Sequence, residues 1–460
     1  MKNKLTKLEF KWICYDMGNS AFILLVATIL PIYFNYLSSS QGVAEHNYLS
    51  YWSYAASLST LIVALAGPIL GTLADYKDHK KKIFLTCAML GALALACFWI
   101  PSSWFAFLVL FIAAKVAYSL SLIVYDSMLT DITTEERMDA VSSKGYAWGY
   151  IASVVPFIIS LIFVLMYDKI GMTLKTAMMI AFILNAVWWI AFTLPLVKSY
   201  KQKYYIEPEA HPALDTFARL KETLMKAKEQ KKVFLFLFAF FFYIDGVYTI
   251  IDMATAYGTS LGLNTTGLLL ALLLTQIVAF PASLTFAVLS KTKDTASLIK
   301  VAIIAYFLIA LFAVQLDKQW EFWILAVAVG CFQGGIQALS RSYFAKIIPE
   351  NASGEYFGLF DICGKGASFL GTMLIGVVTQ ITGKQNLGVA ALSIMFVIGY
   401  LIFNKVYIKF REKLIYILPI LLLISFILLI FSYYLISNLL IKFSIMGFAY
   451  AIIVVLIDSF

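Results

Sequence analysis

The sequence contains little charge and few of the residues that build catalytic or metal centres. Only 13% of its 460 residues are charged, and it has three histidines and five cysteines. The histidines fall in three separate loops, and no two cysteines form a CxxC pair. The nucleophile motif GxSxG and the zinc motif HExxH do not occur. We therefore do not expect an enzyme, and we expect no catalytic residue, no metal site and no cofactor.

Long uncharged stretches fill most of the chain. The composition is 62% hydrophobic, and the mean hydropathy is +0.87. Crossing about 30 Å of hydrocarbon takes about 20 mostly apolar residues in a helix. The predicted spans of this kind are 12–37, 50–74, 83–100, 104–130, 145–167, 174–196, 233–257, 265–289, 298–316, 321–347, 355–380 and 387–404. Two more, near 414–437 and 443–458, close the chain, so the predicted fold class is an all-α polytopic membrane protein.

Lysine and arginine predict the orientation of these spans. With a cytoplasmic N-terminus, the basic residues left in the opposite loops are Lys169, Lys175, Lys318 and Lys384. This asymmetry follows the positive-inside rule. It also explains the net charge of +9 by topology, so no nucleic-acid partner is expected. We predict a multi-pass protein of the cell (inner) membrane that has both termini in the cytoplasm and works as a monomer.

A charged segment near the middle divides the spans into two sets of six. This segment, 197–232, is rich in lysine, and an amphipathic helix is predicted within it at 213–229. The predicted organisation is an N-terminal six-helix bundle at 1–196, a cytoplasmic linker at 197–232, a C-terminal six-helix bundle at 233–405 and two additional transmembrane helices at 406–460.

Ionisable and amide side chains inside the spans are candidates for a solute or ion path. Such groups are costly in hydrocarbon unless they face a bundle interior or a water-filled cavity. They gather in spans 1, 4, 7 and 10, as Asp16, Asn19, Lys115, Asp126, Asp245, Asp252, Gln333, Gln337 and Arg341. Asp126 and Asp252 fall close to the ends of their spans, where headgroups or water also reach. Because every third span carries these residues, the pattern indicates a transporter built from repeats around a shared midplane site.

Depth and spacing distinguish individual candidates. Asp245 and Lys115 lie roughly 18 Å and 16 Å into their spans at 1.5 Å per residue, close to the midplane. They belong either to the path or to a fixed ion pair across the two bundles that only holds the fold. Gln333, Gln337 and Arg341 repeat every four residues on one helix face. There Arg341 either binds a carboxylate or anchors its helix to lipid phosphates.

The loop between spans 2 and 3 carries a gating motif. Its sequence, Gly71-Thr-Leu-Ala-Asp75-Tyr-Lys-Asp-His-Lys80, resembles the GxLxDrxGrrk loop of the major facilitator superfamily. The resemblance implies that Gly71 lets two helices approach closely. It also implies that Asp75 and the basic residues, Lys80 among them, latch the two halves together on the cytoplasmic side.

The second half of the chain offers weaker gating signals. The loop that matches the motif by position, 290–294, keeps only the charge. In span 11, Asp361 and Lys365 are spaced i,i+4, so they are expected to neutralise each other, with a gating role as the alternative.

A closer resemblance covers residues 12–404. The motifs that carry it are Tyr15-Asp16-x-x-Asn19-Ser20, Tyr243-x-Asp245-Gly246, Gln333-x-x-x-Gln337-Ala338-x-Ser340-Arg341-Ser342, and Phe357-Gly358 followed by Gly364-Lys365. Together they resemble the vacuolar amino-acid effluxer branch of the major facilitator superfamily. The resemblance implies a fold of two six-helix bundles, alternating access and export of neutral amino acids without a cofactor.

The predicted function is secondary active transport of a small polar solute across the lipid bilayer. A neutral amino acid is the expected substrate, efflux the expected direction and the proton the candidate coupling ion. Asp245 is the candidate coupling carboxylate, because it could bind and release a proton as access alternates. The alternatives are a non-transporting membrane sensor or scaffold, and a facilitator for another solute class such as sugars or drugs.

Overall fold

The computed structural model describes residues 4–44, 47–207, 230–365 and 368–407. Within these ranges the chain forms helices, joined by loops that contain one isolated β-bridge. The helices of the first part are α1 (Lys7–Ala27), α2 (Ile29–Ser40), α3 (Tyr48–Ala74), α4 (His79–Ala96), α5 (Trp104–Ser127), α6 (Leu129–Ile132), α7 (Glu135–Met166) and α8 (Leu174–Ser199). Those of the second part are α10 (Lys231–Ser260), α11 (Thr265–Leu289), α12 (Thr295–Phe312), α13 (Gln319–Ile347), α14 (Ser353–Lys365), α15 (Ser368–Thr382) and α16 (Gln385–Tyr407).

The all-α polytopic fold is confirmed, and each of the first twelve predicted spans contains a helix. Nine helices of the described ranges are long and apolar enough to cross a membrane. The first predicted span is a pair of helices, α1 and α2, that meet at an angle of 41°. The eleventh contains α14 and α15, on either side of residues 366–367, which lie outside the described ranges, and α4 begins with a histidine and three lysines. The predicted terminal helices, near 414–437 and 443–458, and the linker helix at 213–229 lie outside the described residues.

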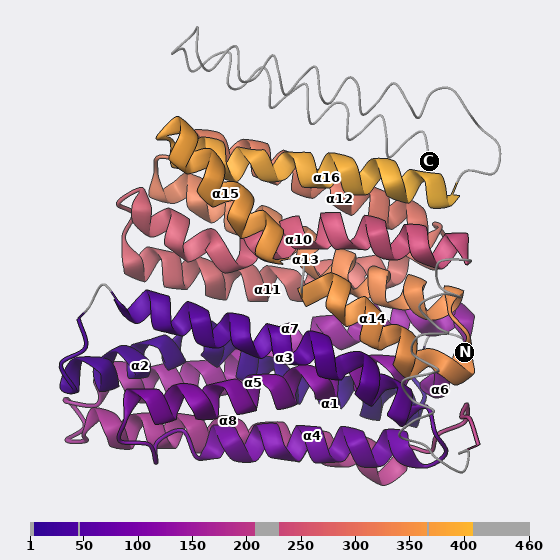
Figure 1. Cartoon of the computed structure of the whole chain (residues 1–460), viewed down its shortest axis with the longest axis horizontal. Coiled ribbons are helices and arrows are strands. Elements are labelled where there is room, and N and C mark those ends of the chain that lie inside the picture. The colour runs from indigo at the N-terminus through magenta and orange to yellow at the C-terminus, as the bar shows by residue number, and fades with distance from the viewer. Residues whose placement is uncertain (1–3, 45–46, 208–229, 366–367, 408–460) are drawn as a thin grey trace, which may run out of the picture.

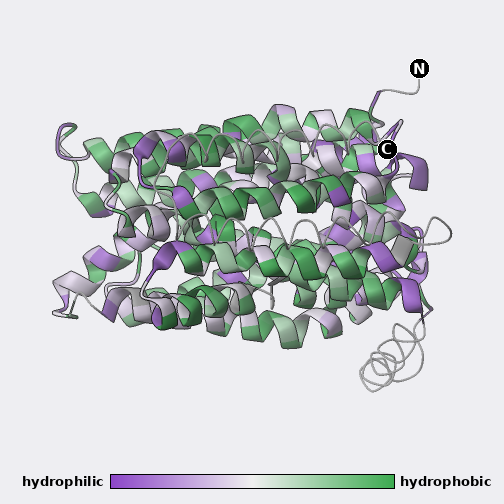
Figure 2. Ribbon diagram, turned by 90° about the horizontal axis from the view of Figure 1, so that it is seen from above, coloured by the Kyte–Doolittle hydropathy of each residue, from purple (hydrophilic) through white to green (hydrophobic). Residues whose placement is uncertain are grey.

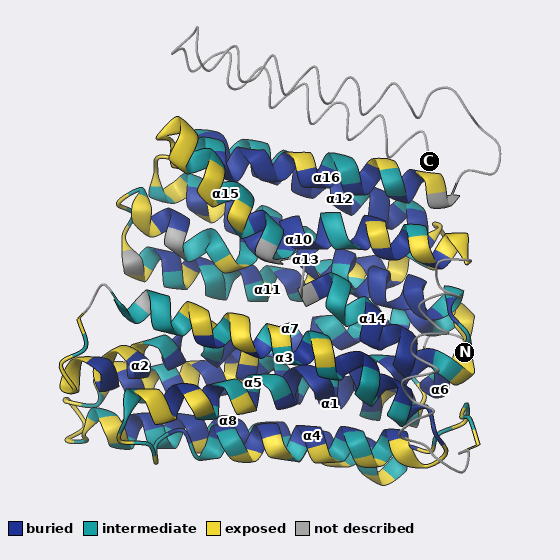
Figure 3. Cartoon of the chain, viewed as in Figure 1, coloured by how far each residue is buried: buried dark blue, intermediate teal, exposed yellow. Residues whose placement is uncertain are grey.

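Polar residues at the helix ends and apolar residues between them explain this architecture. Thr6 and Glu9 form a capping box at the start of α1, and the side chain of Asp294 caps α12. Figure 2 shows hydrophobic residues along the middle of the helices and hydrophilic residues at both ends of the bundle. Buried residues lie where helices face one another, and exposed ones lie on outer faces and in end loops (Figure 3).

The helices form two groups that lie side by side (Figure 1). Helices α1 to α8 pack on one another and are called the N-half here, and α10 to α16 form the C-half in the same way. Between the halves, α3 packs on α14, while α7 packs on α11 and α13. The boundaries predicted at 196, 232 and 405 are not tested by this packing and stay predictions.

One end of the bundle carries most of the positive charge. Helices α4, α7, α10 and α12 all begin there, with Lys80 to Lys82, Arg137, Lys231, Lys232, Lys291 and Lys293 in or beside their first turns. We call this the basic end and the opposite one the far end. In Figure 1 the basic end is on the right, where α6 and the N-terminus are labelled.

The two halves touch backbone to backbone at the basic end, where α3 crosses α14. A Cβ atom added to Gly71 would overlap the carbonyl oxygen of Gly354, and one added to Gly354 would overlap the carbonyl oxygen of Gly71. One turn further along α14, a Cβ on Gly358 would lie 2.7 Å from Cα of Pro68. Glycine is therefore required on both helices for this approach, and the sequence prediction for Gly71 agrees with the geometry.

We expect Gly71→Ala to push α3 away from α14. Overpacking of this kind costs about 1–3 kcal/mol, so the thermal unfolding midpoint of the purified protein should fall. Gly376→Ala in α15 is the matched control, because a Cβ there meets nothing within 4 Å and alanine is favoured in helices. Equal unfolding midpoints for the two variants would contradict the tight crossing.

Candidate functional site

Arg341 of α13 is a C-half cation enclosed by the N-half. Its side chain is 2% exposed. Nη1 donates to Asp126 Oδ1 at 2.9 Å, and Nη2 lies 3.4 Å from Asp16 Oδ2. Nε donates to the hydroxyl of Ser142 on α7 at 2.9 Å. Because a buried guanidinium needs close counter-charges and hydrogen-bond acceptors, these contacts make Arg341 the strongest polar tie between the halves.

Aromatic rings and a glycine complete the surroundings of Arg341. The guanidinium carbon lies 4.7 Å from the ring centroid of Trp12 and 4.5 Å from that of Tyr146, both in the N-half. Cation–π contacts of this kind add stabilisation when they are shielded from water. A Cβ on Gly145 would overlap the Asp16 carboxylate, so glycine at this position of α7 lets the acid reach Arg341.

These positions correct two sequence interpretations. Arg341 was considered as an anchor to lipid phosphates, and this alternative is wrong, because the residue is buried between the halves. Asp126 was placed near headgroups or water, yet it forms the shorter of the two ion pairs to Arg341. Distance from the end of a span misled the prediction, since Arg341 of the other half reaches Asp126 there.

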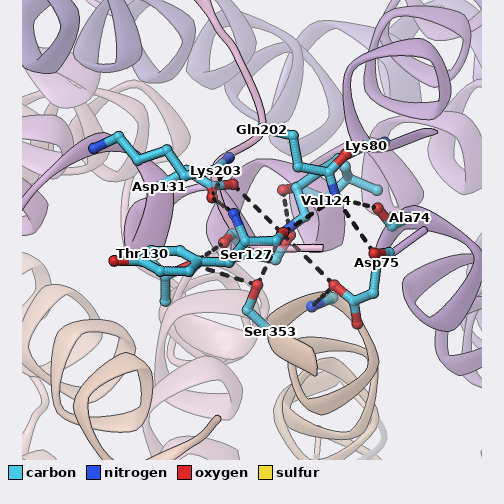
Figure 4. A network of polar contacts seen from close by, with 12 residues as sticks. Ala74, Asp75, Lys80, Val124, Ser127, Thr130, Asp131, Gln202, Lys203 and Ser353 are labelled. Carbon is cyan, nitrogen blue, oxygen red and sulfur yellow. Dashed lines mark hydrogen bonds and ion pairs between the residues drawn. The ribbon is translucent and has the colours of Figure 1, made fainter. Parts of the chain in front are cut away.

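The predicted gating loop forms a second tie, shown in Figure 4. Asp75, directly after α3 at the basic end, is fully buried and accepts hydrogen bonds from the backbone amides of Gly354 at 2.8 Å and Glu355 at 2.9 Å. These amides belong to the first turn of α14, where carboxylates are favourable. Lys80 lies 3.6 Å from Asp75 and donates to the hydroxyl of Ser353 at 2.9 Å. An N-half carboxylate therefore caps a C-half helix.

Burial dominates the electrostatics of this tie. It raises the pKa of Asp75 to about 6, and the Lys80 ammonium and the two amide donors oppose the rise. Asp75 consequently titrates closer to neutral pH than an ordinary aspartate.

Asp131, which the sequence analysis missed, organises the surroundings of Lys80. It lies 3.5 Å from Lys80 Nζ and accepts hydrogen bonds from the backbone amides of Lys203 and Tyr204, each at 3.0 Å, and from the Tyr200 hydroxyl. The first residues of the linker are therefore bound to the gating loop (Figure 4). The sequence did contain a signal for this contact, because Asp131 directly follows span 4 and so lies at the same end of the bundle as the basic gating loop.

A third tie joins the halves with the charges arranged as they are at Arg341. Asp139 of α7 accepts hydrogen bonds from Lys346 Nζ and Ser342 Oγ of α13 and from Thr295 Oγ1 of α12, each at 2.6 Å. Here the C-half supplies the cation and the N-half supplies the acid. In the sequence, loop 290–294 shares only its charge with the gating motif. The contact with Asp139 is made by Thr295, directly after this loop, and by the end of α13.

Asp245 lies apart from these ties, in the core of the C-half. It is fully buried on α10, and its Oδ1 accepts hydrogen bonds from the backbone amide of Gly371 at 3.1 Å and the hydroxyl of Thr249 at 3.2 Å. Its Oδ2 has no hydrogen-bond partner among the described residues. Gly371 belongs to α15, so a backbone amide of this helix donates to the carboxylate.

Lys115 of the N-half and Asp252 of the C-half lie within electrostatic reach of each other, on the far-end side of these ties. The Lys115 ammonium acts electrostatically on Asp252, whereas Asp245 takes its contacts from Gly371 and Thr249. The ion pair considered between Lys115 and Asp245 is therefore not formed. Asp252 is exposed and Lys115 is partly buried, so the far-end side presents one group of each charge.

The remaining predicted residues lie around the same central region. Asn19 and Gln333 are buried on α1 and α13, and Gln337 is partly buried one turn before Arg341. Asp361 of α14 is within electrostatic reach of Asp126. Lys365 ends α14, and its side chain lies outside what the structure describes. The predicted pairing of Asp361 with Lys365 therefore stays a prediction.

The cross-half contacts of Arg341, Asp75 and Asp139 all lie toward the basic end. Arg341 is six residues from the end of α13, or roughly 9 Å at 1.5 Å per residue, and the other two lie at or near helix ends. Within the described ranges, these three polar ties and the backbone contact of α3 with α14 join the halves at the basic end.

Comparison with known proteins agrees with this geometry. Residues 6–414 match the sequence model of the family described as vacuole effluxer Atg22 like. The uncharacterized MFS-type transporter YxiO of Bacillus subtilis (strain 168) is 40% identical over 408 residues, covering 87% of this chain and 95% of YxiO. Autophagy-related protein 22 of Coccidioides immitis is 23% identical, covering 74% of this chain and 69% of its own.

Solved structures show the same fold at low sequence identity. The E. coli fucose:proton symporter FucP superposes with a TM-score of 0.64 at 14% identity, covering 88% of this chain and 98% of FucP. The human organic anion transporter MFSD10 gives a TM-score of 0.59 at 14% identity, covering 86% and 98%. The chain therefore belongs to the vacuole effluxer Atg22-like family, as a multi-pass membrane transporter of the major facilitator superfamily with a small-molecule substrate.

Proposed function

We propose that this transporter exports a neutral amino acid by alternating access, with protons as the coupling ion. In this proposal it lies in the cell membrane with the basic end and both termini in the cytoplasm. The positive-inside rule supports the orientation. The word effluxer in the family description supports the direction. The contacts between the halves support the mechanism.

The observation that carries the proposal is the concentration of breakable polar ties at one end of the bundle. Arg341, Asp75 and Asp139 each join the halves without a covalent bond. If the halves separate, water can replace each partner. The closed and open states then differ little in free energy, because the cost of desolvating the buried charges offsets most of the attraction between them. The structure then corresponds to a state closed toward the cytoplasm.

The far-end side offers the chemistry of a zwitterion site. Lys115 of the N-half can attract a carboxylate, and the exposed Asp252 of the C-half can attract an ammonium group. A neutral amino acid carries one group of each kind. A solute that bridges the two residues would contact both halves at once, as alternating access requires.

Asp245 supports proton coupling. A buried carboxylate with one oxygen lacking a partner among the described residues is costly in the charged form, and a proton removes that charge. Gly371 of α15 donates to the other oxygen. A movement of α15 relative to α10 would alter the hydration of Asp245 and so its affinity for a proton.

Transport should be measured in proteoliposomes with a panel of labelled neutral amino acids, with and without a proton gradient. We expect gradient-dependent movement of at least one of them. Asp245→Asn should abolish accumulation against a gradient while exchange between the two faces continues, because Asn imitates the protonated acid. Asp317→Asn, an exposed acid at the far end, should behave as wild type. If Asp245→Asn still accumulates substrate, another residue carries the proton.

The gating loop gives an independent test that needs no substrate. The hydroxyl oxygens of Thr130 and Ser353 lie 3.4 Å apart across the halves. In a cysteine-free background, Thr130→Cys with Ser353→Cys should therefore cross-link readily. Adding Asp75→Asn should slow cross-linking about tenfold, because loss of one charge-assisted hydrogen bond costs about 1.5 kcal/mol. Asp78→Asn, an exposed acid in the same loop, is the control, and an equal effect of both variants would contradict a latch role for Asp75.

A further inference from the structure

A pocket of about 470 Å³ opens at the basic end, between the start of α10 and the end of α13. Its lining residues are Gln230, Lys231, Lys232, Val233, Lys346, Ile347, Ile348 and Pro349. We call it the lysine pocket. Its volume is in the range of small-molecule sites, about 300–1,000 Å³, and it lies outside the candidate transport path.

The lysine pocket is strongly positive. The described lining residues include three lysines and no acid. Two of them, Lys231 and Lys232, occupy the first turn of α10, which contains no acidic residue and whose N-cap, Gln230, makes no capping hydrogen bond. The positive end of the helix dipole therefore adds to the lysine charges instead of offsetting them. Such an arrangement is unfavourable when the pocket is empty of anions.

One of the three lysines also holds a cross-half tie. Lys346 Nζ lies 2.6 Å from Asp139 Oδ2 and 3.1 Å from Thr295 Oγ1, and its side chain is 17% exposed. It is thus placed between a buried carboxylate on one side and the pocket on the other. An anion in the pocket would compete with Asp139 for this ammonium group.

We propose that the lysine pocket binds a phosphate-bearing anion and that the bound anion weakens the tie between Lys346 and Asp139. Lysine binds phosphate as a point charge without demanding a fixed geometry. The pocket lies at the ends of membrane-spanning helices, the level at which anionic lipid headgroups meet basic residues. The same chemistry is offered by a free phosphate ion. In either case the anion acts as an effector that favours opening of the basic end.

The test uses the full-length chain with the Thr130→Cys and Ser353→Cys pair as a reporter of closure. The protein is placed in vesicles of phosphatidylcholine, with or without phosphatidylglycerol, or in phosphatidylcholine with added inorganic phosphate. Binding of the lipid or of phosphate is measured in parallel. Neither cross-linking nor anion binding depends on transport. A negative result in these two measurements is therefore distinguishable from a failure of the proposed export.

We expect the anion to slow cross-linking and Lys231→Gln with Lys232→Gln to restore the rate seen in phosphatidylcholine alone. The same variant should weaken anion binding about 30-fold, the effect of roughly 1 kcal/mol for each lysine. Lys291→Gln with Lys293→Gln, at the same end but outside the pocket lining, should change neither. A response to phosphatidylglycerol alone identifies a lipid headgroup, and a response to phosphate identifies a free anion.

Three outcomes would overturn the proposal. The first is no effect of either anion on cross-linking or binding. The second is an equal loss in the Lys291 and Lys293 control, which would indicate general charge at the surface. The third is that Lys231→Gln with Lys232→Gln changes the cross-linking rate by the same amount with and without anions. The pocket would then act on the tie without an added ligand.

Discussion

The buried guanidinium of Arg341 is the constraint on which the closed state depends. Its counter-charges, Asp16 and Asp126, belong to the other half of the molecule, so it is satisfied only while the halves are together. A charge left buried without its partner costs several kcal/mol. Parting the halves must therefore bring water to both sides of the ion pair at once. This requirement favours two discrete arrangements of the halves, together or apart, over a continuous range of separations.

The other ties at the basic end repeat the same arrangement, with the acid in the N-half. Asp75 reaches from the N-half to the first turn of α14, and Lys346 reaches from the C-half to Asp139. At these contacts the N-half supplies the carboxylate, and the C-half supplies the cation or the helix amides. Each is matched to the other by charge, while the glycines at the crossing of α3 and α14 allow the close approach that makes the contacts short.

The sequence was sufficient for the spans, the family and part of the site. Each of the first twelve spans predicted from hydropathy contains a helix, and the polar residues of spans 1, 4 and 10 included Asp16 and Arg341, which meet in the structure. The sequence could not identify pairs of residues that come together only because of the way the helices cross. Asp139 and Lys346 lie 207 residues apart, and each alone is an unremarkable charge near a helix end.

The central claim is that Arg341 closes the basic end by binding acids of the opposite half, and a double-mutant cycle tests it most directly. Spin labels at the exposed Lys82 and Asn351, one in each half, would report the distance across this end in wild type, Arg341→Gln, Asp126→Asn and the double variant. We predict one short distance in wild type, a longer second population in each single variant, and an effect in the double variant that is smaller than the sum, because the two residues act as a pair. A single short distance in all four proteins, or strictly additive effects, would contradict the account.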